Sequence, residues 1–221
     1  MRKQVLQALA ILFVVCPIVA LAQAPKDGVY ITDEDIQAVL KHSAEIHRTI
    51  PDNTIRVIDM GQYQLGVAVV QRGAMKGAGA ANANPAGGGN AVPAPAANAG
   101  TPCGEKRPGA TGANGIFHDD TAESYVVISG GGTLITGGTI VNGRRSGAND
   151  EVTTILNGPS CAGTMVGYTS RNVKVGDVII IPEHVPHGFS AIPDHITYLS
   201  IRPDLKKVLQ HGYVNPALKQ P

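Results

Sequence analysis

The sequence lacks the charge and motif signals of several large classes of protein. Lys and Arg total 18 against 17 Asp and Glu, a formal net charge of +1, and no basic stripe is present. Nucleic-acid-binding domains normally gather Lys and Arg on one face, whereas Glu105–Arg107 and Arg144–Arg145 are short enough to be solvated turns. No phosphate-binding loop or dinucleotide fingerprint occurs, so the glycine clusters are expected to be turns. These absences argue against nucleic acid as a partner.

Motifs for nucleophilic catalysis are also missing. The chain has no CxxC pair, so thiol redox catalysis is unsupported. The stretch "GPSCAG" around Ser160 approaches a nucleophile elbow, but Ala162 stands where Gly-x-Ser-x-Gly requires glycine. Tryptophan is absent and aromatic residues make up 4%, yet 43% of the 221 residues are hydrophobic. This composition can build a core, and the length suggests one domain.

A positive signal stands at the N-terminus, where residues 1–22 read as a signal peptide. Two basic residues precede the apolar run Ala8–Val19 and the small residues of Ala20–Ala22, after which we predict cleavage. An uncleaved anchor is the alternative, but a spanning helix needs about 20 apolar residues and this run is shorter. Losing both basic residues leaves 16 basic against 17 acidic side chains, a charge of −1. We expect a periplasmic or secreted protein beginning at Gln23, with no membrane contact after cleavage.

Export would place the remaining cysteines in an oxidising compartment. Cys16 leaves with the signal peptide, so Cys103 and Cys161 remain as an even pair. A bridge between them would close a long loop and stabilise the fold by roughly 4 kcal/mol in the chain-entropy model. The alternative is two free thiols, because bridging requires Cα atoms within about 7 Å. We favour the bridge.

The exported chain divides into an arm, a barrel domain and a tail. Residues 23–52 form a predicted helical arm, in which a capping-box pattern at Thr32 and helical apolar spacing predict a helix from about residue 33 to 47. Residues 53–203 form the predicted barrel. Residues 204–221 form the tail, where apolar spacing predicts one short helix that packs over an opening or edge of the barrel.

Within the barrel domain, two kinds of segment contrast in composition. Residues 73–114 consist mostly of Ala, Gly, Asn and Pro, and lack the apolar bulk that would offset their ordering entropy, so we predict a flexible insertion. The later part alternates short apolar runs with glycine clusters such as Gly130–Gly132, which we interpret as turns. Short strands separated by glycine turns are typical of a sandwich or a small barrel.

Two histidines and a glutamate stand at the ends of these predicted strands. His118 ends one strand, and Glu123 opens the next after a run of turn-forming residues. His187 follows Pro182 in a second hairpin of the same design. Across such turns the three side chains can point into one interior. Two imidazoles and one carboxylate form the facial set that Fe(II), Mn(II), Ni(II) or Zn(II) accepts, with positions left open for substrate.

These residues lie in two motifs that resemble those of the cupin superfamily. The first motif, H-x4-E-x6-G, and the second, G-x5-P-x-G-x2-H, are matched by His118, Glu123 and Gly130, and by Gly176, Pro182 and His187. More narrowly, "FHDDTAESYVVISGGGTLITGG" resembles the exported single-domain bacterial cupins of unassigned activity. With the helices predicted above, the resemblance implies an all-β fold: a double-stranded β-helix, or jelly-roll barrel, with an N-terminal helix and a short C-terminal helix.

The chain departs from the cupin pattern at two positions. Cupins usually carry a further His two residues before the first one matched here, and Ile116 holds that place. The glycine of the second motif is replaced by His184, which we interpret as a turn residue. Asp120 is another candidate oxygen ligand, and Phe117 and Phe189 are expected to wall the cavity. Some barrels of this kind keep the fold without metal, leaving His and Glu as a hydrogen-bonded pair.

The resemblance implies a metal-dependent enzyme acting on a small polar molecule. One divalent ion, Fe, Mn, Ni or Zn, would be held by His118, Glu123 and His187, and Tyr125 is the candidate catalytic residue that moves a proton. Isomerase, lyase and dioxygenase chemistry all fit. The alternatives are a barrel that binds a small ligand without metal or turnover, and an interaction protein that uses the insertion and arm in assembly. From the resemblance, a homodimer is expected.

Overall fold

The computed structural model describes residues 24–76 and 100–218, which form a 10-stranded sheet with two helices. The elements in chain order are α1 (Asp33–Glu45), β1 (Asp52–Asp59), β2 (Gln64–Met75), β3 (Pro102–Cys103), β4 (Asn114–His118), β5 (Glu123–Thr136), β6 (Thr139–Arg145), the π-helix η1 (Val152–Leu156), β7 (Ser160–Val166), β8 (Thr169–Lys174), β9 (Val178–Ile181) and β10 (His187–Asp204). The predicted signal peptide and residues 77–99 of the predicted insertion lie outside the described residues. The all-β prediction is confirmed.

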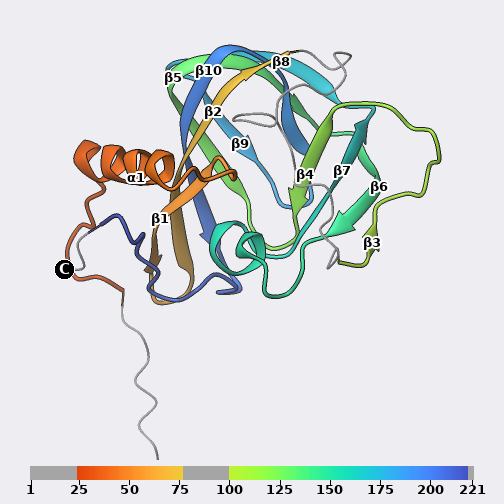
Figure 1. Cartoon of the computed structure of the whole chain (residues 1–221). Helices are drawn as coiled ribbons and strands as arrows, with labels where there is room; N and C mark the ends of the chain where they lie inside the picture. Colours follow the sequence, from red (N-terminus) through yellow and green to blue (C-terminus); the bar gives the residue numbers. More distant parts are fainter. Residues whose placement is uncertain (1–23, 77–99, 219–221) are drawn as a thin grey trace, which may run out of the picture.

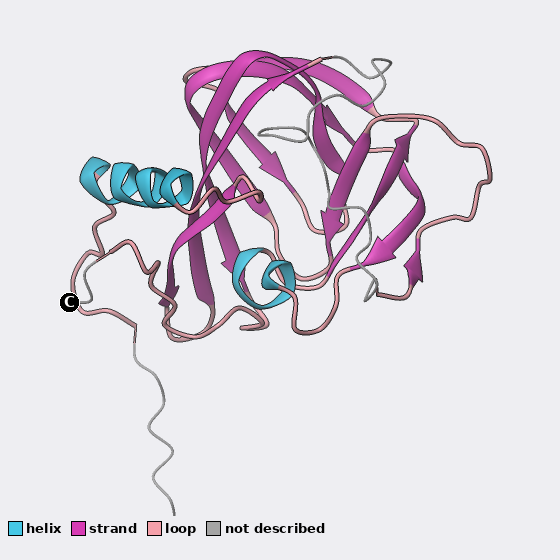
Figure 2. Ribbon diagram, in the orientation of Figure 1, coloured by secondary structure: helices cyan, strands magenta, loops and turns pink. Residues whose placement is uncertain are grey.

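The two longest strands, β5 and β10, close the sheet into a barrel (Figure 1). They pair with each other along most of their length, and β10 also pairs with β2 in its second half and with β4 at His187. β5 pairs with β9 near its start and with β8 near its end. Both strands therefore belong to two antiparallel sheets, which curl around a shared interior (Figure 2). This arrangement confirms the predicted jelly-roll barrel of the cupin type.

The glycine cluster Gly130–Gly132 does not form the turn that its composition predicts. Strand β5 continues through it, and its pairing with β10 changes register nearby. Gly130 has a φ of 67°, and a Cβ there would lie 2.0 Å from the carbonyl oxygen of His195. The position therefore requires glycine for two reasons, a left-handed backbone and a close approach of β10. The glycines bend one long strand from the first sheet into the second.

The N-terminal helix begins as predicted and ends two residues earlier. Thr32 and Asp35 form the capping box with reciprocal side-chain contacts. The helix covers the outer face of β1 and β2, where Ile36 and Val39 pack against Ile55. It ends at Glu45, and the backbone becomes left-handed two residues later.

The predicted C-terminal helix is wrong. The carboxylate of Asp204 accepts hydrogen bonds from the backbone N–H groups of Val208 and Leu209, and Lys207 has a φ of 53°, so the backbone turns instead of winding. Beyond this turn the chain runs beside β1, to which it is joined by backbone hydrogen bonds from Val57 to the Tyr213 carbonyl and from residue 215 to the carbonyl of residue 55. The tail thus covers an edge of the sheet, as expected, but in extended form.

The predicted bridge between Cys103 and Cys161 is confirmed, with the two Cα atoms 6.1 Å apart. It joins β3 to β7, and β3 also pairs with β6, so the end of the predicted insertion is attached to the barrel. The start of that segment, Gly73–Met75, continues β2. Over residues 24–76 and 100–218, no helix has the length and apolar character needed to cross a membrane.

Candidate metal centre

The three predicted ligands converge inside the barrel. His118 ends β4, Glu123 begins β5 and His187 begins β10. The Oε2 atom of Glu123 lies 3.3 Å from His118 Nε2 and 2.9 Å from His187 Nε2. One ligand atom from each residue lies within 4.8 Å of the other two. All three residues are buried, with at most 4% of their surface exposed. Strand pairing, rather than nearness in sequence, therefore brings this cluster together.

Hydrogen bonds on the far side of each ring fix which nitrogen faces the cluster. A carbonyl oxygen only accepts, so Nδ1 of His187, 2.9 Å from the Val185 carbonyl, carries a proton and donates it. The Ser160 hydroxyl donates its proton to the Gly158 carbonyl at 2.8 Å, and therefore accepts from Nδ1 of His118 at 2.7 Å. In each neutral ring Nε2 then keeps a lone pair directed at the carboxylate. This is how metal-binding histidines are commonly held.

The two oxygens of Glu123 have different partners. Oε1 accepts from Asn157 Nδ2 at 2.9 Å, from Ser200 Oγ at 2.8 Å and from Arg202 Nε at 3.0 Å. Oε2 accepts from the Tyr125 hydroxyl at 2.9 Å and is the oxygen that faces both histidines. Three donors thus occupy Oε1 and leave Oε2 as the atom available to a metal ion. A ligand of this kind binds through one oxygen.

The electrostatics of the cluster favour an ionised carboxylate beside a neutral imidazole. Burial alone would raise the pKa of Glu123, but the charge of Arg202 holds it well below its usual range. Burial lowers the pKa of His118 despite the neighbouring carboxylate. Lone pairs of neutral rings directed at a carboxylate oxygen repel it unless a cation lies between them. The donor set and its protonation therefore fit a divalent metal ion.

Arg202 connects this cluster to the rest of the barrel. Its side chain is 1% exposed, and its guanidinium also donates to the Leu156 carbonyl at 2.9 Å and to Asp52 Oδ2 at 2.6 Å. Burial acts to lower the pKa of Arg202, but the carboxylates of Asp52 and Glu123 outweigh it and raise the pKa. The arginine therefore stays charged between two carboxylates. It ties β10 to β5, to β1 and to the end of η1.

Other residues considered from the sequence lie outside the cluster. Ile116 is the cross-strand partner of His187, so an apolar side chain stands where a further histidine is usual. His184 is an exposed turn residue with a φ of 61°, which suits a position where glycine is usual. Asp120 pairs with Lys206 instead of the histidines.

Of the two phenylalanines expected to wall the cavity, only one does so. Phe189 is 3% exposed and belongs to the interior cluster that contains Tyr125. Phe117 lies next to His118 on a strand, so it points to the opposite face. It packs instead with the disulfide cluster and under the guanidinium of Arg145. The expectation for Phe117 is wrong because side chains alternate along β4.

Four residues of the site were not found from the sequence. They are Asn157, Ser160, Ser200 and Arg202. Ser200 and Arg202 follow a readable signal, since they continue the inward-facing alternation of Tyr198 along β10, where polar side chains are unexpected. Asn157 and Ser160 flank a glycine–proline turn after η1, and no pattern links that turn to the histidines.

Comparisons with known proteins add little about activity. No family model matches the chain, and no curated protein matches it in sequence. The chain is similar to the crystal structure of BH2720 from Bacillus halodurans, at 12% identity over 88% of this chain and 93% of that one, with a TM-score of 0.38. It is also similar to KdgF from Halomonas sp., at 12% identity over 71% and 83% of the two chains with a TM-score of 0.29. For the oxalate decarboxylase of Lactobacillus farciminis, the identity is 9% over 70% and 33%, with a TM-score of 0.28.

Likenesses of this size do not identify a reaction or a ligand. The class of the protein follows instead from its own geometry: a jelly-roll barrel in which both cupin motifs deliver their His and Glu residues to one buried point. The fold is a cupin-type barrel, and its interior holds a cluster able to bind a metal ion.

Proposed function

We propose that the protein binds one divalent transition-metal ion through His118, Glu123 and His187 and acts on a small polar molecule. The observation that carries the proposal is the direction of the ligand atoms. Both imidazoles are anchored through Nδ1, and one carboxylate oxygen faces both Nε2 atoms. The neutral His118 ring carries its proton on Nδ1 and has none on Nε2 to donate to the carboxylate, and a metal ion between the two would take that place.

The three ligand side chains narrow the choice of metal ion. Two imidazoles and one carboxylate suit Fe(II), Mn(II), Ni(II) and Zn(II) and disfavour hard cations that prefer all-oxygen sites. Three protein ligands also leave coordination positions for a substrate, where the ion would act as a Lewis acid and template. Isomerase, lyase and dioxygenase reactions all use such positions. The chain is proposed to act outside the cytoplasm, because its disulfide suits an oxidising compartment.

Tyr125 is the candidate for proton transfer. Its hydroxyl donates to Glu123 Oε2 at 2.9 Å, so it stands beside the oxygen that faces the histidines. Burial and the neighbouring carboxylate raise the pKa of Tyr125 well above its usual range, and the phenol stays protonated. In this proposal it acts as a hydrogen-bond donor to a bound molecule or as a general acid.

A second candidate function is binding without turnover. Ile116 places an apolar side chain beside His187 where a fourth ligand is usual. A barrel that binds an ion weakly, or binds none, would hold a small ligand and release it unchanged. Saturable binding with no product over long incubation identifies this case, whereas product formation that depends on the ion identifies the enzyme.

The test of the metal site is elemental analysis of the chain from Gln23, purified without chelator and without a nickel column. We expect about one ion per chain, lost in His187→Ala and retained in the matched control His184→Ala, whose histidine is exposed. Absence of metal in the parent protein after reconstitution with Fe(II), Mn(II), Ni(II) and Zn(II) would reject the proposal.

A further inference from the structure

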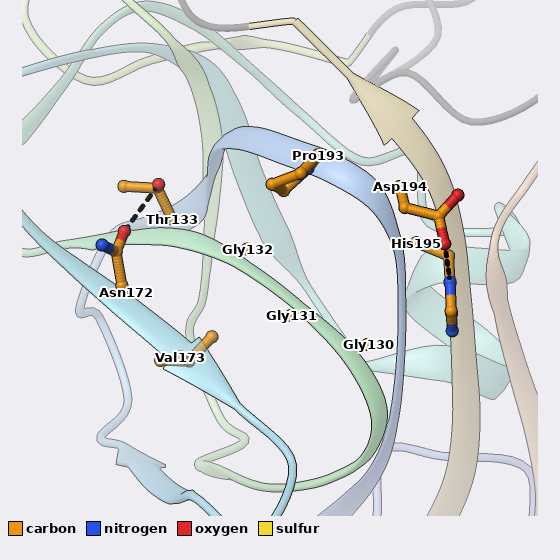
Figure 3. A pocket seen from close by; sticks show the side chains of 9 residues that line it. All are labelled: Gly130, Gly131, Gly132, Thr133, Asn172, Val173, Pro193, Asp194 and His195. Atoms are coloured by element: carbon orange, nitrogen blue, oxygen red, sulfur yellow. Dashed lines mark hydrogen bonds and ion pairs between the residues drawn. The ribbon is translucent and has the colours of Figure 1, made fainter.

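A hollow on the barrel lies over the glycine segment of β5. It has a volume of about 340 Å³, within the usual range for small-molecule sites. Its lining comes from three separate elements: Gly130–Gly132 of β5, Asn172 of β8, and Pro193 and His195 of β10 (Figure 3). The glycines carry no side chains, so backbone forms that part of the lining. None of these residues belongs to the metal cluster.

A serine next to this hollow forms a hydrogen-bonded chain with a histidine and an aspartate that line it. Ser129 Oγ lies 2.8 Å from His195 Nε2, and His195 Nδ1 lies 2.6 Å from Asp194 Oδ2. The ionised carboxylate only accepts, so Nδ1 carries the proton. In the neutral ring Nε2 then holds a lone pair and accepts the proton of the serine hydroxyl. This is the order of roles that activates a serine nucleophile.

Two backbone features hold these three residues in place, an irregularity in the pairing of β10 and a glycine in β5. The pairing of β5 with β10 shifts register between Ala191 and Ile196, which releases Asp194 and His195 from pairing with β5. Gly130 follows the serine directly and lines the hollow, and a Cβ there would lie 2.0 Å from the His195 carbonyl oxygen. Only glycine lets the serine strand approach the histidine segment this closely.

We infer that this hollow is a second site, at whose border Ser129 reacts with small carboxylic esters held in the hollow. His195 takes the hydroxyl proton as Oγ bonds to the ester carbonyl carbon, and returns it to the departing alkoxide when the ester C–O bond breaks. Water then attacks the acyl-serine with His195 again as base, releasing the acid and restoring the hydroxyl. The cycle consumes one ester and one water and requires no metal or redox partner. It is independent of the proposed metal chemistry.

The exposure of the two partners sets the expected strength of this site. The side chain of His195 is 42% exposed and that of Asp194 is 87% exposed. Water therefore weakens the electrostatic effect of the Asp194 carboxylate on the ring. Removing Asp194 should for this reason slow the reaction less than removing the base, His195. We expect slow turnover of activated esters, with the histidine contributing about 100-fold or more to the rate.

The experiment is labelling of the full exported chain with a fluorophosphonate probe, read by intact mass and peptide mapping. We expect one adduct, at Ser129, absent from Ser129→Ala and about 100-fold slower in His195→Gln. Asp194→Asn should slow it less, by about tenfold, because this carboxylate is exposed. Ser124→Ala, on the same strand, is the matched control and should label at the parent rate. Hydrolysis of para-nitrophenyl acetate should follow the same order.

Chelator separates this site from the metal centre. Labelling of Ser129 and ester hydrolysis should both continue after the metal has been removed, whereas a metal-dependent hydrolysis stops. An adduct at another residue, or an equal labelling rate in the parent and in His195→Gln, would show that the contact is a hydrogen bond only and would overturn the inference.

Discussion

Ser160 holds His118 by the nitrogen that faces away from the carboxylate. With its own proton committed to the Gly158 carbonyl, the hydroxyl can only accept, and it forces Nδ1 of the ring to donate. Removing this contact frees the ring to rotate and to change tautomer. We predict that Ser160→Ala weakens metal binding by about 10- to 100-fold, the range typical of groups that orient metal-bound histidines.

Competition with a chromophoric chelator measures that loss. Ser190→Ala, which removes a hydroxyl bonded only to the Thr133 carbonyl among the contacts described, is the control and should bind metal as the parent does. An affinity for Ser160→Ala equal to the parent would show that packing alone orients the imidazole.

Ile116 offers the reverse experiment, a ligand added instead of removed. It lies two residues before His118 on the same face of β4, and it is paired with His187 in β10. Because it borders both histidines, an imidazole at this position can complete a four-ligand set. We predict that Ile116→His tightens metal binding at least about tenfold, and that Ile116→Gln does not, since an amide is a poor ligand for these ions. The same chelator competition decides between these outcomes.

The three candidate metal ligands could be predicted from the sequence, because two motifs fix their positions. The residues that hydrogen-bond to those ligands could not, because only the fold brings them close. The histidines and the glutamate follow from spacing because each ligand ends or begins a strand at a turn. The donors to Glu123 Oε1 do not, because Asn157, Ser200 and Arg202 are 34, 77 and 79 residues away in the chain. Only the closure of the barrel makes them neighbours.

At the scale of elements, Arg202 is the residue on which several strands depend. Its charge lies between Asp52 of β1 and Glu123 of β5, with one N–H on the carbonyl that ends η1. Arg202→Met would leave the buried carboxylate of Glu123 and the partly buried carboxylate of Asp52 without their charged partner, and such a loss costs about 3–5 kcal/mol of folding stability. Urea unfolding measures it.

Arg107 provides the matched control for that measurement. It pairs with Glu105 at 2.8 Å, but both side chains are at least half exposed. Arg107→Met should change the free energy of unfolding by less than about 1 kcal/mol, because water already solvates both charges. Equal effects of the two variants would contradict the role given to the buried arginine.

Elements were predictable where local signals agreed with the fold. The capping box at Thr32 started α1 as expected, since the cap is satisfied within one turn. The tail helix failed because Asp204, at the end of β10, accepts the backbone N–H groups of Val208 and Leu209 four and five residues later, and this turn takes the place of a helix. The turn expected at Gly130–Gly132 failed because those glycines serve the close approach of neighbouring strands. A cluster of glycines shows where the backbone is unusual, but it does not show whether the cause is a turn or a close approach of strands.

At the scale of the whole molecule, stability and the buried cluster are linked through protons. In the metal-free protein the folded-state pKa values of His118 and Glu123 both lie below their ordinary values. The unfolded chain therefore binds more protons than the folded chain, and acid favours unfolding. The contribution of His118 is fully present above its unfolded pKa of about 6.5 and is lost as pH falls through its folded value. Glu123 adds a similar loss at lower pH, below about 4.5.

We therefore predict that the free energy of unfolding of the metal-free protein falls as pH decreases from 7 toward 5. Each proton taken up on unfolding contributes a slope of up to about 1.4 kcal/mol per pH unit. Urea unfolding in chelator, for the parent and for His118→Gln, tests this residue, because the variant lacks the imidazole that titrates. The parent should show the steeper slope between pH 5 and 6.5, and parallel curves would mean that the ring does not titrate on unfolding. Saturating metal should then raise the stability of the parent near pH 7, by about 2.7 kcal/mol at a hundred times the Kd. That gain should shrink on acidification, since the protons that the unfolded chain takes up also compete for the ligand atoms.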